Sequence, residues 1–345
     1  MAKLDIKNAK FYIDGAVSNP ENPACEGRLI GVCSDVCAFF DGGFADIEKT
    51  RLDFIKNLSG WRASGVDIVT LGLQSPSPFR EHYKKAREQK KEKSEKNIEF
   101  KSSALKADGS LDKGYLENAK RIIEAADGAG LLVCVNIFSA WQERIFEDEY
   151  AILNGAFNVV DWLLEKNFSN VMVNITDVSH IFYKSSVLCG GGVIRLLKSL
   201  KERSADNLIL GAGLKSLGNI PAALLGEYIK NSDFVPIYSN AENAKLAHNT
   251  KKMLGDICFL KGIMRENGAD IPIIMAKGDD LGERYNSYGK NNLAEALENG
   301  ISWFYYDREG FFMLPVDWDK DSSQKKRNFF DVAGDIKHGR QLTAT

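Results

Sequence analysis

The chain has 345 residues, of which 44% are hydrophobic, and its formal net charge is −2. This apolar content is sufficient for a large core, whereas the balance of charges gives no electrostatic reason to expect binding to nucleic acid or to an anionic membrane surface. The longest apolar stretches have the length of strands, which excludes a transmembrane helix.

The first residues, 1–7, lack the apolar segment of a secretory signal. We therefore expect a cytoplasmic protein, or a secreted one if a leader has been removed. Phe11 to Gly15 predicts a β-hairpin with an Asp-Gly turn. We expect residues 1–27 to form a hairpin extension that is either a lid over the opening of the main domain or an entry segment.

Eight short apolar runs recur along residues 28–338, and a stretch with helical periodicity follows each of them. The predicted strands are 28–33, 67–73, 131–138, the first part of 170–180, 208–212, 233–238, 271–275 and 301–306. The predicted helices are 46–63, 115–129, 147–166, 193–203, 221–230, 241–267, 291–299 and a last helix within 317–336. Residues 339–345 are a tail.

This alternation is typical of a closed parallel sheet that is buried on both faces. An open, doubly wound sheet is the alternative, but no nucleotide-binding fingerprint follows the first strand. The sequence therefore predicts the α/β class, with a single (β/α)8 TIM barrel, a short N-terminal β-hairpin extension and a C-terminal helix.

Three local features have a structural and a functional interpretation. The lysine-rich stretch 84–96 mixes both charge signs, which favours a solvated helix over a polyanion site. Gly190–Gly192 precede a helix, as in phosphate-binding loops, but the other residues of such motifs are missing. Cys33 and Cys37 have the spacing of half a metal site, although six scattered cysteines are more typical of buried reduced thiols. We expect no metal and no cofactor.

In a (β/α)8 barrel the functional groups lie at the carboxyl ends of the strands. Aromatic residues occur there beside amides and carboxylates, a combination that suits carbohydrate, because flat rings stack on sugar faces and polar groups bind hydroxyls. For Trp303 a place in the core is an equal alternative. The predicted substrate-binding residues are Gln74, Trp141, Gln142, His180, Tyr238, Asn240, Lys277 and Trp303.

Several segments, in order along most of the chain, resemble bacterial cellulase-like glycoside hydrolases of clan A. They include Asn170-Val-Met-Val and Pro315-Val-Asp-Trp. The resemblance implies a (β/α)8 retaining hydrolase with an acid/base Glu after strand four and a nucleophilic Glu after strand seven. The other matching segments are 108–112, 121–127, 137–142, 161–166, 233–240, 272–280, 302–303 and 329–330.

The departures from this family fall on the positions that the resemblance implies to be catalytic. Val178 stands at the position of the acid/base Glu, Gly278 stands at that of the nucleophile, and Tyr238 replaces a usual His. Val and Gly can neither donate a proton nor form a glycosyl intermediate, so the two-Glu mechanism cannot operate from these positions.

We therefore expect a pseudoenzyme, a non-catalytic scaffold that binds an oligo- or polysaccharide or a protein partner. One alternative is a divergent O-glycosyl hydrolase that uses Asp177 with Asp279 or Asp280, and another is a structural subunit of an assembly. Less favoured chemistries are a Schiff base at Lys277 and a metal pair of Asp177 with His180. The sequence does not indicate an oligomeric state.

Overall fold

The computed structural model describes residues 2–23, 25–34, 47–74, 103–140, 142–177, 179, 183–238, 250–278, 292–307 and 317–340. Its main sheet has eight parallel strands in the order β8-β7-β6-β5-β4-β11-β10-β9. The first and last strands of this order are joined through Leu214, whose N–H donates to Pro236 O and whose carbonyl accepts from Tyr238 N, both at 2.8 Å. The sheet is thus closed, and the predicted (β/α)8 barrel is confirmed.

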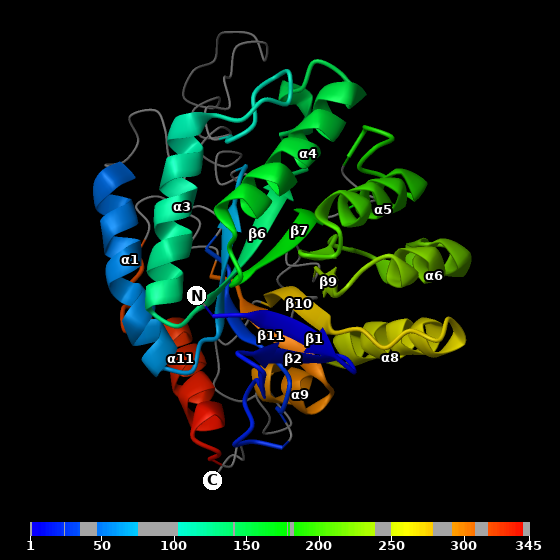
Figure 1. Cartoon of the computed structure of the whole chain (residues 1–345). Coiled ribbons are helices and arrows are strands. Elements are labelled where there is room, and N and C mark those ends of the chain that lie inside the picture. The colour runs from blue at the N-terminus through cyan, green and yellow to red at the C-terminus, as the bar shows by residue number, and fades with distance from the viewer. Residues whose placement is uncertain are drawn as a thin grey trace, which may run out of the picture.

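The strands and helices alternate along the chain (Figure 1). The barrel strands are β4 Ile30–Val32, β5 Ile68–Gly72, β6 Leu132–Phe138, β7 Val171–Thr176, β8 Ile209–Gly211, β9 Val235–Ile237, β10 Ile273–Gly278 and β11 Ile301–Tyr305. The helix that follows each of them is, in turn, α1 Ile47–Ala63, α3 Lys113–Gly128, α4 Glu149–Lys166, α5 Gly191–Ser204, α6 Ala222–Lys230, α8 Thr250–Glu266, α9 Asn292–Glu298 and α11 Gln324–Lys337. Short 3-10 turns occur at η2 Glu143–Ile145 and η3 Leu217–Asn219.

Local sequence signals fix where several of these helices begin. Asp112 accepts a hydrogen bond from Tyr115 N at the start of α3, and Asp148 accepts one from Ala151 N at the start of α4. Such caps satisfy backbone donors that a helix leaves unpaired at its first turn. The buried residues of α3 repeat at helical spacing, so one face of the helix packs on the barrel: Ala119, Ile122, Ile123 and Ala126.

Alternate residues of each barrel strand face inward. In one layer Asn136 of β6 pairs in register with Asn174 of β7. On its other side Asn136 pairs with Gly72 of β5, and Asn174 pairs with Gly211 of β8. A Cβ at Gly211 would lie 2.6 Å from Phe234 O and 3.0 Å from the Phe234 ring. The glycine therefore makes room inside the barrel for a bulky neighbour.

The N-terminal residues form a separate antiparallel sheet of β1 Leu4–Lys7, β2 Lys10–Ile13 and β3 Ala16–Val17. The predicted Asp-Gly turn is present, with φ of 53° at Asp14 and 80° at Gly15.

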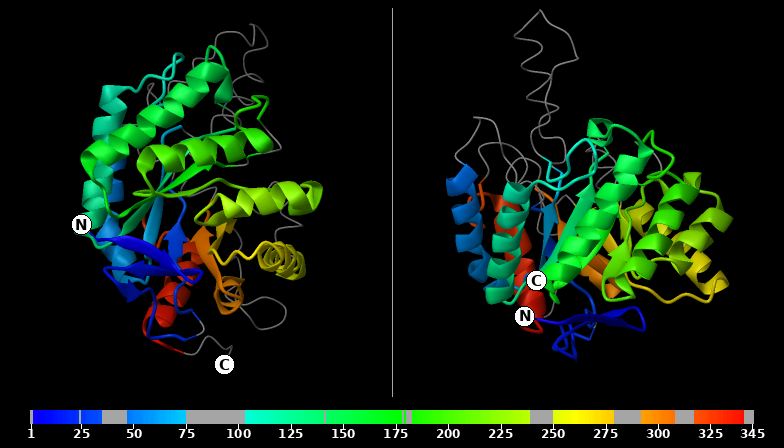
Figure 2. Two further views of the ribbon diagram at one scale, coloured as in Figure 1. Left: turned by 45° about the vertical axis from the view of Figure 1, so that its right-hand side comes forward. Right: turned by 45° about the horizontal axis from the view of Figure 1, so that its top comes forward.

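This small sheet lies against the amino ends of the barrel strands, away from the opening where we expected it. Leu4 N donates to Ser169 O, just before β7, and Asn19 Nδ2 donates to Asp67 Oδ2, just before β5. Figure 2 shows the blue N-terminal sheet at this end of the barrel. The expectation of a lid is therefore wrong, although a hairpin extension is present.

No disulfide joins the five cysteines among the described residues. Cys25, Cys33 and Cys134 are buried as expected, whereas Cys189 is partly buried and Cys258 is exposed. In the described part of the chain, no helix has the length and apolarity needed to cross a membrane. The proposed division into 1–27, 28–338 and 339–345 stays a prediction.

Candidate functional site

Five of the residues predicted for the site have described side chains: Gln74, Gln142, Asp177, Tyr238 and Trp303. For Lys277 and Gly278 only the backbone is described, and it belongs to β10. The remaining predicted positions lie outside the described residues: Trp141, Val178, His180, Asn240, Asp279 and Asp280.

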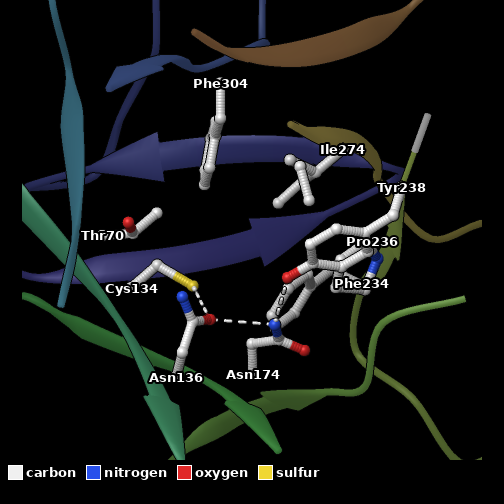
Figure 3. A pocket seen from close by; sticks show the side chains of 10 residues that line it. Thr70, Cys134, Asn136, Asn174, Phe234, Pro236, Tyr238, Ile274 and Phe304 are labelled. Carbon is white, nitrogen blue, oxygen red and sulfur yellow. Dashed lines mark hydrogen bonds between the residues drawn. The ribbon is translucent and has the colours of Figure 1, made fainter. Parts of the chain in front are cut away.

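The centre of the site is a hydrogen-bonded trio of side chains inside the barrel (Figure 3). Asn174 Nδ2 donates to Asn136 Oδ1 at 2.8 Å and to the Tyr238 hydroxyl at 2.9 Å. The trio borders a cavity of about 10 Å³, the space of one water molecule. The residues that line the cavity are Thr70, Cys134, Asn136, Asn174, Phe234, Pro236, Tyr238, Ile274, Ala276 and Phe304.

The three side chains of this floor of the barrel opening, Asn136, Asn174 and Tyr238, are uncharged, and Lys277 of β10 is the charged residue within the strand bounds. Within the bounds given above, the eight barrel strands contain no Asp and no Glu. Asn174 is only 1% exposed, and its Oδ1 has no partner among the described residues. Amides and hydroxyls can both donate and accept hydrogen bonds, so the floor can bind uncharged polar groups without burying an ion.

Gly213 lies between Asp177, at the end of β7, and the ring of Tyr238, after β9. Because it has no side chain, these two parts of the chain can lie close together. A Cβ at Gly213 would lie 2.2 Å from Asp177 O and 2.4 Å from the Tyr238 ring. The structure therefore brings the predicted Tyr238 to the Asn174 floor, with 9% of its surface exposed.

Asp177 follows the end of β7, but its carboxylate is held by the connection after β6. Oδ1 accepts from Ala140 N at 3.2 Å and from the Tyr183 hydroxyl at 2.8 Å. The same hydroxyl lies 2.8 Å from Phe138 O. Burial raises the pKa of Tyr183 well above its usual value, and the negative charge of Asp177 adds to this rise. Asp177 thus joins two loops and is not among the residues that line the cavity.

Gln74 and Gln142 are both buried, and the side chain of Gln74 braces two neighbouring segments. Gln74 is 2% exposed, and its side chain accepts from Ser139 N at 3.0 Å and donates to Ser103 Oγ at 3.2 Å. Gln142 is 1% exposed, and its backbone N–H donates to Ser139 O. Both amides are therefore buried beneath the surface of the barrel opening.

Trp303 lies outside the barrel interior, which favours the core position over the alternative of a platform for sugar. It is 3% exposed and alternates along β11 with Phe304, which lines the cavity. Its neighbour on the same strand face, Tyr305, stacks on Phe329 of α11 with ring centroids 4.4 Å apart. The indole thus belongs to the layer between the sheet and the helices, where a ligand at the opening cannot reach it.

The structure also corrects the end of the seventh predicted strand. β10 runs to Gly278, three residues beyond the predicted end at Met275, and Gly278 pairs with Tyr305 after an irregularity in the register. Lys277 and Gly278 are therefore strand residues. The backbone at Gly278 reaches the barrel opening without a side chain that could act as nucleophile.

Asn136 and Asn174 are site residues that sequence reasoning missed. The prediction concentrated on residues after each strand, whereas these two amides lie within strands. The available signal was a single amide in each of two mainly apolar runs, 132–138 and 171–176. Such a residue must find a buried hydrogen-bond partner, and here the two amides supply it to each other.

The described residues do not assemble a metal site, since no three His, Cys, Asp or Glu side chains converge. Cys33 Sγ donates to Ala276 O at 2.8 Å inside the barrel, and Cys37 lies outside the described ranges. Of the three glycines at the start of α5, Gly192 has a packing role, because a Cβ there would lie 1.7 Å from Ser186 O. The lysine-rich stretch 84–96 also lies outside the described ranges.

No family model matches the sequence, and no curated protein matches it significantly. Solved structures do resemble it over nearly the whole chain. The endo-1,4-β-mannanase of Rhizomucor miehei is 11% identical with a TM-score of 0.59, covering 97% of this chain and 99% of that one. A family 5 glycoside hydrolase mannosidase of the same fungus is 12% identical with a TM-score of 0.59, covering 98% of each chain.

A broad-specificity endoglucanase from Clostridium longisporum is also similar, with 10% identity and a TM-score of 0.54, covering 90% of this chain and 97% of that one. At these identities the likeness concerns architecture alone. The chain therefore has the (β/α)8 fold that glycoside hydrolases of family 5 also adopt.

Proposed function

We propose that this chain is a glycoside-hydrolase-like barrel without the two-Glu mechanism, which binds carbohydrate or a protein partner through the opening at the carboxyl ends of its strands. The observation that carries the proposal is the neutral floor of Asn136, Asn174 and Tyr238. A hydrolase of this fold would need carboxyl groups above that floor, whereas Val178 and Gly278 occupy the expected positions.

Oligosaccharide is the ligand class that this floor favours. Sugar hydroxyls donate and accept hydrogen bonds, as amides and the Tyr238 hydroxyl do, and they carry no charge that a neutral site would leave unpaired. The similar structures include mannanases, a mannosidase and endoglucanases. Manno- and gluco-oligosaccharides are therefore the first probes to use.

The alternative is a hydrolase in which Asp177 acts with Asp279 or Asp280. A general acid must reach the glycosidic oxygen, at hydrogen-bond distance. The Asp177 carboxylate is instead engaged by Ala140 N and by the buried Tyr183 hydroxyl. These contacts favour a bracing role, and so we rank the hydrolase second.

Calorimetric titration with mannohexaose and cellohexaose tests the proposal. We expect binding by the wild type and a loss of affinity of about tenfold or more in Asn136→Ala, because the floor then lacks one amide. The matched control is Asn154→Ala, which removes an amide on the outside of α4 that donates to Asp108 O. It should bind as the wild type does.

If neither oligosaccharide binds, the protein-partner and structural-subunit interpretations gain support. Native mass measurement then separates an assembly from a monomer. The cytoplasmic location and the lack of nucleic-acid and membrane partners stay predictions.

A further inference from the structure

A short segment at the barrel opening, Tyr183–Ser186, is fastened by two carboxylates from the preceding β/α connection. Lys184 N donates to Glu143 Oε1 at 2.6 Å, and Ser185 N donates to Glu143 Oε2 at 3.1 Å. Ser186 N donates to Glu149 Oε1 at 2.6 Å. Three consecutive backbone N–H groups therefore end on acidic side chains of one neighbouring connection.

The serine hydroxyls strengthen the same contact. Ser186 Oγ donates to Glu149 Oε2 at 2.9 Å, and Ser185 Oγ donates to Glu149 Oε1 at 3.3 Å. Hydrogen bonds to an ionised acceptor are roughly twice as strong as neutral ones. The two glutamates thus hold the segment more firmly than its solvent-exposed position alone would suggest.

The inner end of the segment is fixed independently of these glutamates. Tyr183 is 6% exposed, with its hydroxyl between Phe138 O and Asp177 Oδ1. Its carbonyl accepts from Cys189 Sγ at 3.0 Å. The segment therefore has a buried anchor at Tyr183 and charged fastenings at the three residues that follow.

The two glutamates and the segment that they hold belong to different connections of the barrel. Glu143 belongs to η2 and Glu149 to the first turn of α4, both after β6, whereas the segment itself lies between β7 and α5. Both connections are at the carboxyl ends of their strands, where the floor of Asn136 and Asn174 opens. A change in the contact would thus alter the wall of the opening between β6 and β7.

We propose that Tyr183–Ser186 is a strap held against the β6–α4 connection by Glu143 and Glu149, and that loss of these two carboxylates releases residues 184–186 while Tyr183 stays anchored. The strap is a conformational device of the barrel opening. It depends on charge at two surface positions and is independent of whether the site binds sugar.

Amide hydrogen exchange of the full chain, measured by NMR, tests the strap. In Glu143→Ala/Glu149→Ala we expect the amides of Lys184, Ser185 and Ser186 to exchange faster by about tenfold or more, because each loses its only acceptor recorded in the structure. The amides of Leu196 and Leu197, in the helix α5 that follows, should exchange as in the wild type and report that the fold persists.

Glu147→Ala is the matched control, since Glu147 is an exposed carboxylate of the same connection with no recorded contact to the strap. It should leave the exchange of residues 184–186 unchanged. Equal exchange at these three amides in the double variant and the wild type, with α5 intact, would overturn the proposal. If the double variant fails to fold, the single variants Glu143→Ala and Glu149→Ala provide the comparison, the first for Lys184 and Ser185 and the second for Ser186, and unchanged exchange in both would overturn it equally.

Discussion

The hydroxyl of Tyr183 lies 2.8 Å from Oδ1 of Asp177, and both groups belong to the connection after β7. Asp177 is the only acidic residue described at the end of that strand. The contact holds its carboxylate against Tyr183, six residues further along the chain. The contact also explains why the Asp177 carboxylate does not point to the cavity, although Asp177 follows the end of β7.

Tyr183→Phe should destabilise the fold by about 1–3 kcal/mol, because Asp177 and Phe138 O then lose a buried donor. Chemical denaturation gives the free energy of unfolding. Tyr150→Phe is the control, since Tyr150 is 76% exposed and its change should stay within about 0.5 kcal/mol. Equal stability of the two variants would argue against a bracing role for Tyr183.

Gly192→Ala should destabilise the protein by about 1–3 kcal/mol, because the added methyl meets the carbonyl of Ser186 and forces the backbone to shift. Gly60→Ala, at an exposed position inside α1 with nothing within 4 Å of the new Cβ, should instead stabilise it by about 0.5–1 kcal/mol. Thermal unfolding of both variants checks the difference in sign. A neutral Gly192→Ala would contradict the packing role of this glycine.

Hydrogen bonds from the backbone N–H and the hydroxyl of Ser186 lower the pKa of Glu149. A lowered folded-state pKa means that the contribution of this group is present above the unfolded pKa and is lost as the pH falls through the folded value. The contact of Glu149 with Ser186 should therefore loosen only in acid, below the usual titration range of glutamate. A carboxyl NMR titration measures the midpoint, which should rise in Ser186→Ala; an unchanged midpoint would show that the hydroxyl does not contribute.

Trp303→Ala should cost about 3–5 kcal/mol of stability, because a large side chain leaves the layer between sheet and helices. At a temperature where the variant is folded, its affinity for any oligosaccharide that the wild type binds should be unchanged. Calorimetry on both proteins checks this. A variant of wild-type stability that no longer binds would restore the interpretation of Trp303 as a sugar platform.

The element pattern could be predicted from the sequence because each unit carries a strong local signal. The strand predicted at 131–138 is observed at Leu132–Phe138, and the helix predicted at 221–230 is observed at Ala222–Lys230. Apolar strands, amphipathic helices and their spacing are sufficient to specify the barrel.

The direction of side chains could not be predicted in the same way. Strands buried on both faces show no polar alternation, so nothing in the sequence distinguishes inward Phe304 from outward Trp303. The orientation of Asp177 depends on Tyr183 and on Ala140 N, which belongs to a different strand connection. The N-terminal hairpin likewise formed as predicted, but its position beneath the barrel depends on distant residues such as Ser169.

A reducing-end assay on a panel of mannans, glucans and their oligosaccharides tests most directly the proposal that the barrel lacks glycosidase activity. We predict no release above the buffer blank for the wild type, because Val178 and Gly278 stand where the acid and nucleophile are expected and Asp177 braces two loops. Release of sugar that disappears in Asp177→Asn, or in Asp279→Asn together with Asp280→Asn, would contradict this proposal.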